Sequence, residues 1–342
     1  MIYGRFMKNI RRTVFTIALI LAVGGLLSGC GGQPEAEKWE KVQKEIFAMN
    51  TIMDITLYGE NAGAVMNQAT ERIHKYESLF SVNKPDSDIS RINSAGGKAV
   101  RVSPETYELV QKCMDISDTT EGLFDISIYP LVKKWGFTTE KYRIPSEQER
   151  NDCIKQIDYK KIRLLPDNRI QTGEEMQIDL GAAAKGYLSQ KLMELFQQNG
   201  ITSAIVSLGG NVQTIGVKED GNSYHIGITN PADGSSLYGT LDVKDKAVVT
   251  SGIYQRFFTK AGKSYHHIMD KRTGMPAENT LASVTVIAED GTRADGLATA
   301  LYVMGEEKAV EYQKEHPEME LILIRKDGTF WQSEKAGMKR EH

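Results

Sequence analysis

Hydrophobic and polar positions along the chain follow two different periods, and each period predicts a different element. Apolar and polar residues alternate at 53–57, which predicts a half-buried strand. Apolar residues at 65–80 recur at helical spacing, which predicts a helix directly after that strand. Short apolar runs predict further strands at 201–208, 224–228, 247–250, 283–288 and 321–325. The Asp-Gly pair at 327–328 predicts a hairpin turn.

Capping residues indicate where helices begin. The Ser-Pro pair at 103–104 is typical of an N-cap and a first helical position. The Ser-x-x-Glu at 146–149 matches a capping box, and the helix is expected to run through Ile157. Another helix should occupy residues 186–200, closed by a glycine. Residues 83–97 are rich in turn-forming types, so we expect a loop there.

The mixture of elements predicts the fold class. Helices and strands lack the regular alternation of a parallel sheet, so the pattern indicates an α+β fold. Neither G-x-G-x-x-G nor G-x-x-x-x-G-K-[ST] is present, so neither a Rossmann dinucleotide site nor a P-loop is supported. A length of 342 residues with 40% apolar content allows one large domain of mixed sheets and helices, or two lobes with a site between them.

The N-terminus has the pattern of a secretory signal. Basic residues at 8–12 precede an apolar run at 13–27, which is too short for a typical membrane span. The run leads to Leu-Ser-Gly and then Cys30, an arrangement that resembles a bacterial lipobox. Residues 1–29 are therefore expected to be a lipoprotein signal peptide that is cleaved before Cys30, whose thiol would carry the lipid. The alternative is an ordinary secretory signal with an incidental cysteine.

The rest of the chain follows from that interpretation. Residues 30–45 are expected to form a lipidated polar tether, and residues 46–335 the folded domain. The protein would then be anchored to the cell membrane by its lipid and face outside the cytoplasm. Cys113 and Cys153 lie in amphipathic helical patterns, which favours two free buried thiols over a disulfide. A net charge of -3 gives no basic footprint, so we expect no nucleic-acid partner.

The stretch 248–305 holds the most candidate chemistry. Thr292 is expected to cap a helix that stops at Gly305. On this helix Asp295 and Thr299 are four residues apart and share a face. A carboxylate and a hydroxyl are hard oxygen ligands that suit Mg²⁺. The alternative is structural, with the carboxylate favouring the helix N-terminus and the hydroxyl bonding back to the preceding turn.

Short motifs of small, polar and aromatic residues occur along the chain in a fixed order. The motifs are Met49-Asn50-Thr51, Phe124 to Ser127 with 130–137, Asp179 to Gly186, Ser207 to Asn211, Thr250-Ser251-Gly252, His266 to Asp270 with Thr273-Gly274, and Ala294 to Thr299. Each motif alone is weak, and their order along the chain makes the set specific. Together they resemble one known family, the ApbE-type FAD:protein FMN transferases, which are membrane-tethered flavin-handling lipoproteins. The resemblance covers nearly all of the chain after the signal peptide.

The resemblance implies roles for individual residues. His267 falls where the family has a histidine proposed as the general base, although the adjacent His266 is an equal candidate by sequence alone. Asp295 and Thr299 would bind Mg²⁺ together with the backbone carbonyl of Ala182. Contacts to FAD would come from seven residues, one of which, Phe124, could instead belong to the core. These are Met49, Leu123, Phe124, Asp125, Asp179, Lys185 and Ile268.

Two positions depart from the family pattern. The family usually has Gly where Asn50 stands, and Asn is the residue other than Gly that best tolerates a left-handed backbone. It usually has Pro where Lys271 stands, so the turn after His267 cannot be transferred from the family.

The resemblance also implies a reaction and a partner. A hydroxyl of an acceptor protein would attack the FMN-side phosphorus of FAD and release AMP, with Mg²⁺ as cofactor. The acceptor would be another exported protein with a Ser/Thr motif, because the mature chain has no match to the family's acceptor pattern. Two alternatives stay open: an FAD pyrophosphatase that yields FMN and AMP, and a flavin-binding carrier lipoprotein without catalysis.

Overall fold

An eight-stranded antiparallel sheet forms the centre of the protein, as seen in a computed structural model that describes residues 40–341. The expected signal peptide, Cys30 and the first part of the tether lie outside the described residues. The strands, in spatial order, are β1 (Lys41–Ala48), β2 (Thr51–Tyr58), β6 (Ser203–Ser207), β7 (Asn211–Ile215), β10 (Ala247–Gly252), β15 (Leu281–Ala288), β16 (Glu320–Arg325) and β17 (Phe330–Gln332).

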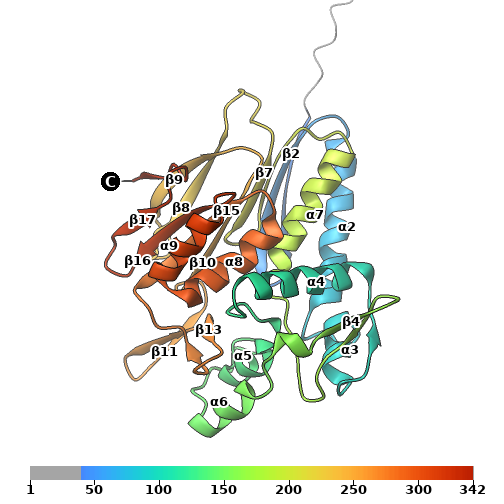
Figure 1. Ribbon diagram of the computed structural model, residues 1–342. Coiled ribbons are helices and arrows are strands. Elements are labelled where there is room, and N and C mark those ends of the chain that lie inside the picture. Colours follow the sequence, from blue (N-terminus) through green and yellow to red (C-terminus); the bar gives the residue numbers. More distant parts are fainter. Residues whose placement is uncertain (1–39, 342) are drawn as a thin grey trace, which may run out of the picture. The chain divides into compact units, whose positions relative to one another are not determined.

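Helices cover one face of this sheet. They are α2 (Ala62–Phe80), α7 (Ala184–Gln198), α8 (Gly291–Met304) and α9 (Glu306–Glu315), and Figure 1 shows α2 and α7 side by side. The alternation along each strand explains how the sheet supports two layers. Val249 of β10 joins the core beneath the helices, whereas its neighbour Val248 joins a second core on the other face.

The second core lies under a small three-stranded sheet. This sheet consists of β8 (Tyr224–Thr229), β9 (Leu237–Val243) and β18 (Lys339–Arg340). Ile226 and Leu241 pack there with Val248, Ile287 and Ile322 from the large sheet. The large sheet is therefore covered on both faces, which accounts for the fully buried strand β15.

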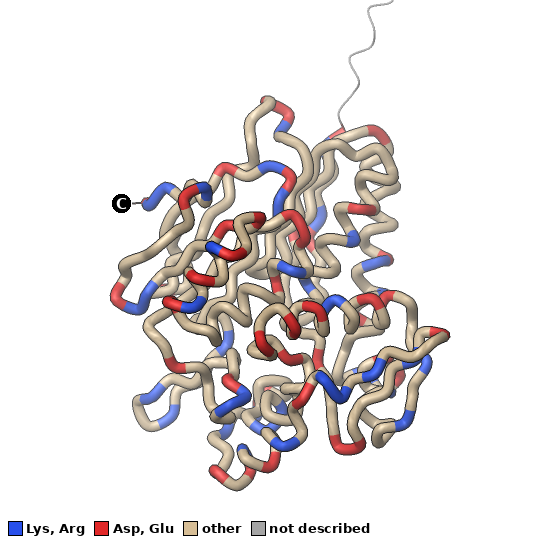
Figure 2. Tube along the Cα trace, viewed as in Figure 1, with Lys and Arg blue, Asp and Glu red and all other residues tan. Residues whose placement is uncertain are grey.

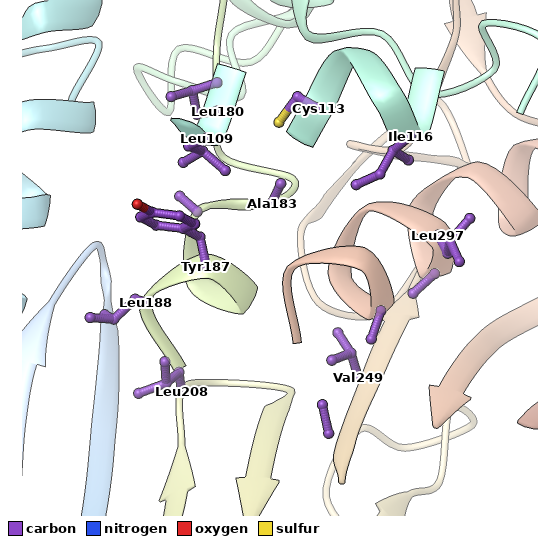
Figure 3. Close-up of a cluster of buried hydrophobic side chains, with 14 of the residues drawn as sticks. Leu109, Cys113, Ile116, Leu180, Ala183, Tyr187, Leu188, Leu208, Val249 and Leu297 are labelled. Atoms are coloured by element: carbon purple, nitrogen blue, oxygen red, sulfur yellow. The ribbon is translucent and has the colours of Figure 1, made fainter. Parts of the chain in front are cut away.

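Three further helices and two hairpins complete the region next to α8. They are α4 (Pro104–Thr119), α5 (Tyr129–Trp135), α6 (Glu147–Ile154), the hairpin of β11 (Phe257–Lys260) with β12 (Lys263–His266), and the hairpin of β13 (Met269–Asp270) with β14 (Met275–Pro276). Figure 3 shows Leu109, Cys113 and Ile116 of α4 near side chains of α7 and α8, including Tyr187 and Leu297. This packing fixes α4 relative to the two helices that carry candidate site residues.

The remaining elements are α3 (Asp88–Ser94), a sheet of β3 (Val100–Arg101), β5 (Arg169–Gln171) and β4 (Arg163–Leu165), and the short 3₁₀-helices η1 (Ile126–Ile128) and η2 (Tyr159–Lys161). Acidic and basic residues are interspersed along the trace (Figure 2). None of the helices between residues 40 and 341 combines the length and hydropathy that a bilayer crossing requires.

The α+β prediction is confirmed, and so are most predicted elements. The described residues form one compact unit, which supports one domain over two lobes. Ser103 caps α4, Ser146 and Glu149 form the expected capping box, and Cys113 and Cys153 are buried free thiols.

Five details of the prediction were wrong. Residues 83–97 contain helix α3, whose N-cap is Ser87, and the helix predicted to reach Ile157 ends at Ile154. Asp290, and not Thr292, caps α8, because its carboxylate accepts hydrogen bonds from the backbone N–H groups of Thr292 and Arg293. Residues 41–45 of the expected tether belong to β1, which pairs with β2 along one side, and β18 extends the fold beyond residue 335.

Candidate active site

A cavity of about 870 Å³ lies where the central sheet, α8 and the surrounding loops meet. Its volume is in the range of small-molecule and cofactor sites. Segments far apart in sequence form its wall, among them the β1–β2 turn, the start of α7 and the loop before β13. Every site residue that the family resemblance implied within the described chain lines this cavity. These residues are Met49, Leu123, Phe124, Asp125, Asp179, Ala182, Lys185, His267, Ile268, Asp295 and Thr299.

Helices α7 and α8 cross at two glycines beside the cavity. A Cβ on Gly186 would collide with the backbone oxygen of Gly291 and lie 2.6 Å from the Cβ of Asp295. The absence of side chains lets the Gly186 N–H, one of the first-turn donors without an intrahelical partner, donate to Asp295 Oδ2 at 2.8 Å. The crossing thereby holds the Asp295 carboxylate at the N-terminus of α7.

Asp295 is a buried carboxylate with little compensation. Burial raises its pKa to about 6, opposed by the charge of Lys185, the Gly186 N–H and the nearby amide of Asn211. Asn211 is itself fully buried, and within the described chain neither its side-chain nitrogen nor its oxygen has a hydrogen-bond partner. Buried polar groups without partners are costly. A further polar or charged group between Asp295 and Asn211 would relieve both.

Thr299 and Ala182 line the same cavity. Thr299 Oγ1 lies 3.2 Å from Ser251 Oγ of β10, so the hydroxyl is held by a neighbouring strand. The first bond of the α7 ladder runs from the Tyr187 N–H to the Ala183 carbonyl, which leaves the Ala182 carbonyl outside the ladder. Residues 40–341 contain no group of three His, Cys, Asp or Glu side chains suited to a metal. A cation here would depend on Asp295 plus neutral oxygens, which suits Mg²⁺ with substrate phosphates and water.

The structure separates the two adjacent histidines. His267 lines the cavity, whereas His266 is only 8% exposed and packs edge-on against the Tyr302 ring. Burial together with the charge of Arg256 lowers the pKa of His267 to about 3, so its imidazole is neutral near pH 7. Its Nδ1 lies 3.2 Å from the Arg256 carbonyl, which can only accept a hydrogen bond. Nδ1 therefore carries the proton and Nε2 the lone pair, the form a general base needs.

Lys185 and Arg256 supply positive charge to this cavity. Lys185 lies in the first turn of α7 and donates to the Gly209 carbonyl at 3.1 Å. Arg256 follows β10 and acts electrostatically on both His267 and Asp179. Burial raises the pKa of Asp179, which accepts the Gly181 N–H at 2.9 Å. Two cations in the lining of one cavity favour an anionic ligand such as a phosphate group.

Asp125 lies at the cavity but is held by internal contacts. Its carboxylate, whose side chain is fully buried, accepts from Lys271 Nζ at 2.7 Å and from both the backbone and the hydroxyl of Ser127. Lys271, which stands where the family usually has Pro, ties the β13–β14 turn to the loop at 123–126 through this ion pair. Phe124 lines the cavity and also belongs to the core, at 3% exposure, and its contact with FAD stays a prediction.

The turn between β1 and β2 confirms the expectation for Asn50. Met49 and Asn50 have φ values of 49° and 58°, the left-handed backbone of a tight two-residue hairpin turn. The Met49 N–H donates to Glu77 Oε1 at 2.9 Å, which fixes the turn against α2.

A profile of the ApbE family matches residues 49–323, most of the chain. The chain belongs to the ApbE family. An ApbE relative from Klebsiella pneumoniae is 32% identical over 77% of this chain and 83% of its own length. Another, from Treponema pallidum, is 29% identical over 90% of this chain and 89% of its own. Both carry the name FAD:protein FMN transferase. The crystal structure of the ApbE protein from Thermotoga maritima matches with a TM-score of 0.81 and 31% identity, over 86% of this chain and 97% of that one.

Three residues of this ApbE site were not singled out from the sequence. Asn211 and Ser251 stand inside motifs that carried the resemblance, but only the structure shows the unpartnered amide beside Asp295 and the contact with Thr299. Arg256 stands four residues after Gly252, and no local pattern distinguishes it from a surface arginine. Its position depends on how the chain turns after β10 toward His267.

Proposed function

We propose that this protein transfers the FMN part of FAD to a Ser or Thr hydroxyl of an acceptor protein and releases AMP. The observation that carries the proposal is the placement of neutral His267, with Nε2 as its acceptor nitrogen, in the same cavity as Asp295 and Thr299. The names of the ApbE relatives support the same substrates.

The reaction divides into one bond made and one bond broken. The acceptor hydroxyl gives its proton to His267 Nε2, and its oxygen attacks the phosphorus on the FMN side of FAD. The bond from that phosphorus to the bridging oxygen breaks, and AMP leaves with the electron pair. As in other phosphoryl transfers, the protein contributes position and charge stabilisation. Lys185 and Arg256 are the cations that would balance the charge of the phosphates.

The donor set beside Asn211 fits Mg²⁺, and Asp295, Thr299 and the Ala182 carbonyl would hold it. The unpartnered buried amide of Asn211 and the buried Asp295 carboxylate support this fit. When bound, the ion would supply Lewis-acid stabilisation of phosphate charge. The protein's part is to keep the Asp295 carboxylate in place through the Gly186 N–H.

Incubation of the mature chain with FAD and Mg²⁺, with and without a peptide that bears the acceptor motif, tests the proposal. AMP release together with a peptide mass gain equal to esterified FMN is the expected result. AMP and free FMN with unmodified peptide would identify a pyrophosphatase. FAD binding without AMP release at any Mg²⁺ concentration would indicate a flavin-binding carrier without catalysis.

The location outside the cytoplasmic membrane stands as a separate proposal. It rests on the signal pattern of residues 1–29 and on Cys30, which would carry the lipid. Replacement of Cys30 by Ser should move the protein from the membrane fraction to the soluble fraction of cells. Membrane retention of that variant would contradict lipid anchoring at Cys30.

A further inference from the structure

The end of the β1–β2 hairpin carries an exposed apolar pair beside the cavity. Phe47 is 71% exposed and Ile52 is 52% exposed, and the two are direct cross-strand partners. Residues 49–51, between them in sequence, line the cavity. Opposed apolar side chains would normally be buried, so this pair forms a small apolar surface at the edge of the site.

A second pair on the same face carries like charges. Glu45 and Asp54 are cross-strand partners, both are exposed, and each is two residues from a member of the apolar pair. Within residues 40–341 neither carboxylate makes an ion pair or a hydrogen bond. Like charges directly opposite each other destabilise a sheet. A cation from a partner would relieve this repulsion.

The backbone of β1 is also available to a partner. β1 is the edge strand of the eight-stranded sheet, so one side of it is not paired within that sheet. Its other face, with Ile46 and Ala48, is buried in the core and gives the edge a fixed position. An extended segment can add to such an edge by main-chain hydrogen bonds, with alternate side chains beside those of the strand.

We propose that the acceptor protein docks as an extended segment along β1. An apolar side chain of the segment lies beside Phe47, the β1 member of the apolar pair. A Lys or Arg two residues away, about 7 Å along the strand, lies beside Glu45 and extends across β1 toward Asp54. This arrangement leads the segment past Met49 into the cavity, where its hydroxyl reaches His267. The inference rests on the proposed function, because it names the region of this protein that would recognise the acceptor protein.

The probes are two fluorescein-labelled peptides with the same acceptor motif. One has Lys-x-Leu before the motif and the other has Glu-x-Leu. Anisotropy measures their binding to the FAD-loaded wild type and to the variants Phe47→Thr/Ile52→Thr and Glu45→Lys/Asp54→Lys. A double variant Glu60→Lys/Glu219→Lys, at exposed sites outside this surface, changes the net charge by the same amount and serves as the control.

The wild type and the control should bind the Lys peptide at least about tenfold more tightly than the Glu peptide, a difference of about 1.4 kcal/mol. Glu45→Lys/Asp54→Lys should reverse that preference, and Phe47→Thr/Ile52→Thr should weaken both peptides by about tenfold or more. FAD affinity, measured by quenching of flavin fluorescence, should be equal in all variants.

Equal peptide affinities across the variants, or no peptide binding to the wild type, would overturn the docking surface. Variants that change the oligomeric state in sedimentation while peptide binding is unchanged would show that the surface binds a second copy, which also overturns it. Binding with the predicted preferences but without FMN transfer would refute the proposed function and leave the docking surface in place.

Discussion

The Asp295 carboxylate lies at a position that disfavours its own charge. Burial raises the pKa of Asp295 to about 6, whereas the pKa of an aspartate in the unfolded chain is near 3.8. The folded protein therefore binds a proton on this carboxylate more tightly than the unfolded chain does. Ionisation of Asp295 therefore lowers the stability of the fold progressively as pH rises from about 4 to 6, and the full loss of stability is present above that range. A buried charge that weakens the fold is typical of a functional site.

We expect Asp295→Asn to be more stable than the wild type at pH 7.5 without metal, by about 1–2 kcal/mol once a weaker bond to the Gly186 N–H is deducted. The variant should also show no Mg²⁺-dependent rise in melting temperature and no transfer. Urea unfolding and thermal scans measure both effects, with exposed Asp86→Asn as the control. If Mg²⁺ still stabilised the Asp295→Asn variant, Asp295 would not be a ligand of the metal.

The two histidines should differ sharply in their effects. His267→Ala should lower the single-turnover transfer rate by about 10²- to 10⁴-fold, because it removes the proton acceptor. His266→Ala should change the rate only a few-fold and act mainly on stability, since His266 packs on Tyr302 away from the cavity. Comparable losses in both variants, or a loss only in His266→Ala, would move the base away from His267.

At the scale of elements, Lys271 and Asp125 join two loops that the sheet does not connect. We expect Lys271→Met to destabilise the protein by about 2–4 kcal/mol, because it leaves a buried carboxylate without its cation. Asp125→Asn/Lys271→Met should recover part of that loss. Urea unfolding of the two single variants and the double variant measures the coupling, and a coupling energy near zero would show that the pair does not hold the loops together.

The sequence predicted an element correctly where residues that are neighbours in sequence determine it. The alternation at 53–57 and the cap at Ser103 each depend on neighbours in sequence, and both were confirmed. The cap of α8 was misplaced by two residues because Thr292 and Asp290 are both good caps, and only the backbone geometry selects the carboxylate. The sheet order could not be predicted, because pairs such as β2 with β6 join strands separated by more than 140 residues.

At the scale of the whole molecule, the site could be predicted only through the family resemblance. Met49, Asp179, His267 and Asp295 are distant in sequence and meet only because α7 and α8 pack on one sheet. Spacing alone suggested the Asp295–Thr299 pair and left its role open. The choice between His266 and His267 needed the structure. His266 is the last residue of β12 and is buried against Tyr302, whereas His267 follows the strand and lines the cavity.

The pH dependence of Mg²⁺ stabilisation connects these scales. His266 and His267, with pKa values of about 4 and 3, stay neutral in the folded protein at pH 5. Histidines in the unfolded chain gain protons below about pH 6.5. The two histidines therefore lower the stability of the fold as pH falls. Protonation of Asp295 below about 6 acts in the opposite direction and competes with the metal.

The rise in melting temperature caused by Mg²⁺ isolates the Asp295 effect, because the histidine contributions are the same with and without the ion. We expect a clear rise at pH 7.5, and an apparent Mg²⁺ affinity about tenfold weaker at pH 5, where about a tenth of the carboxylate is ionised. Thermal scans over a Mg²⁺ titration at both pH values, without FAD, measure it, and Asp295→Asn should respond at neither. Equal affinities at pH 5 and 7.5 would mean that the ion does not bind the Asp295 carboxylate.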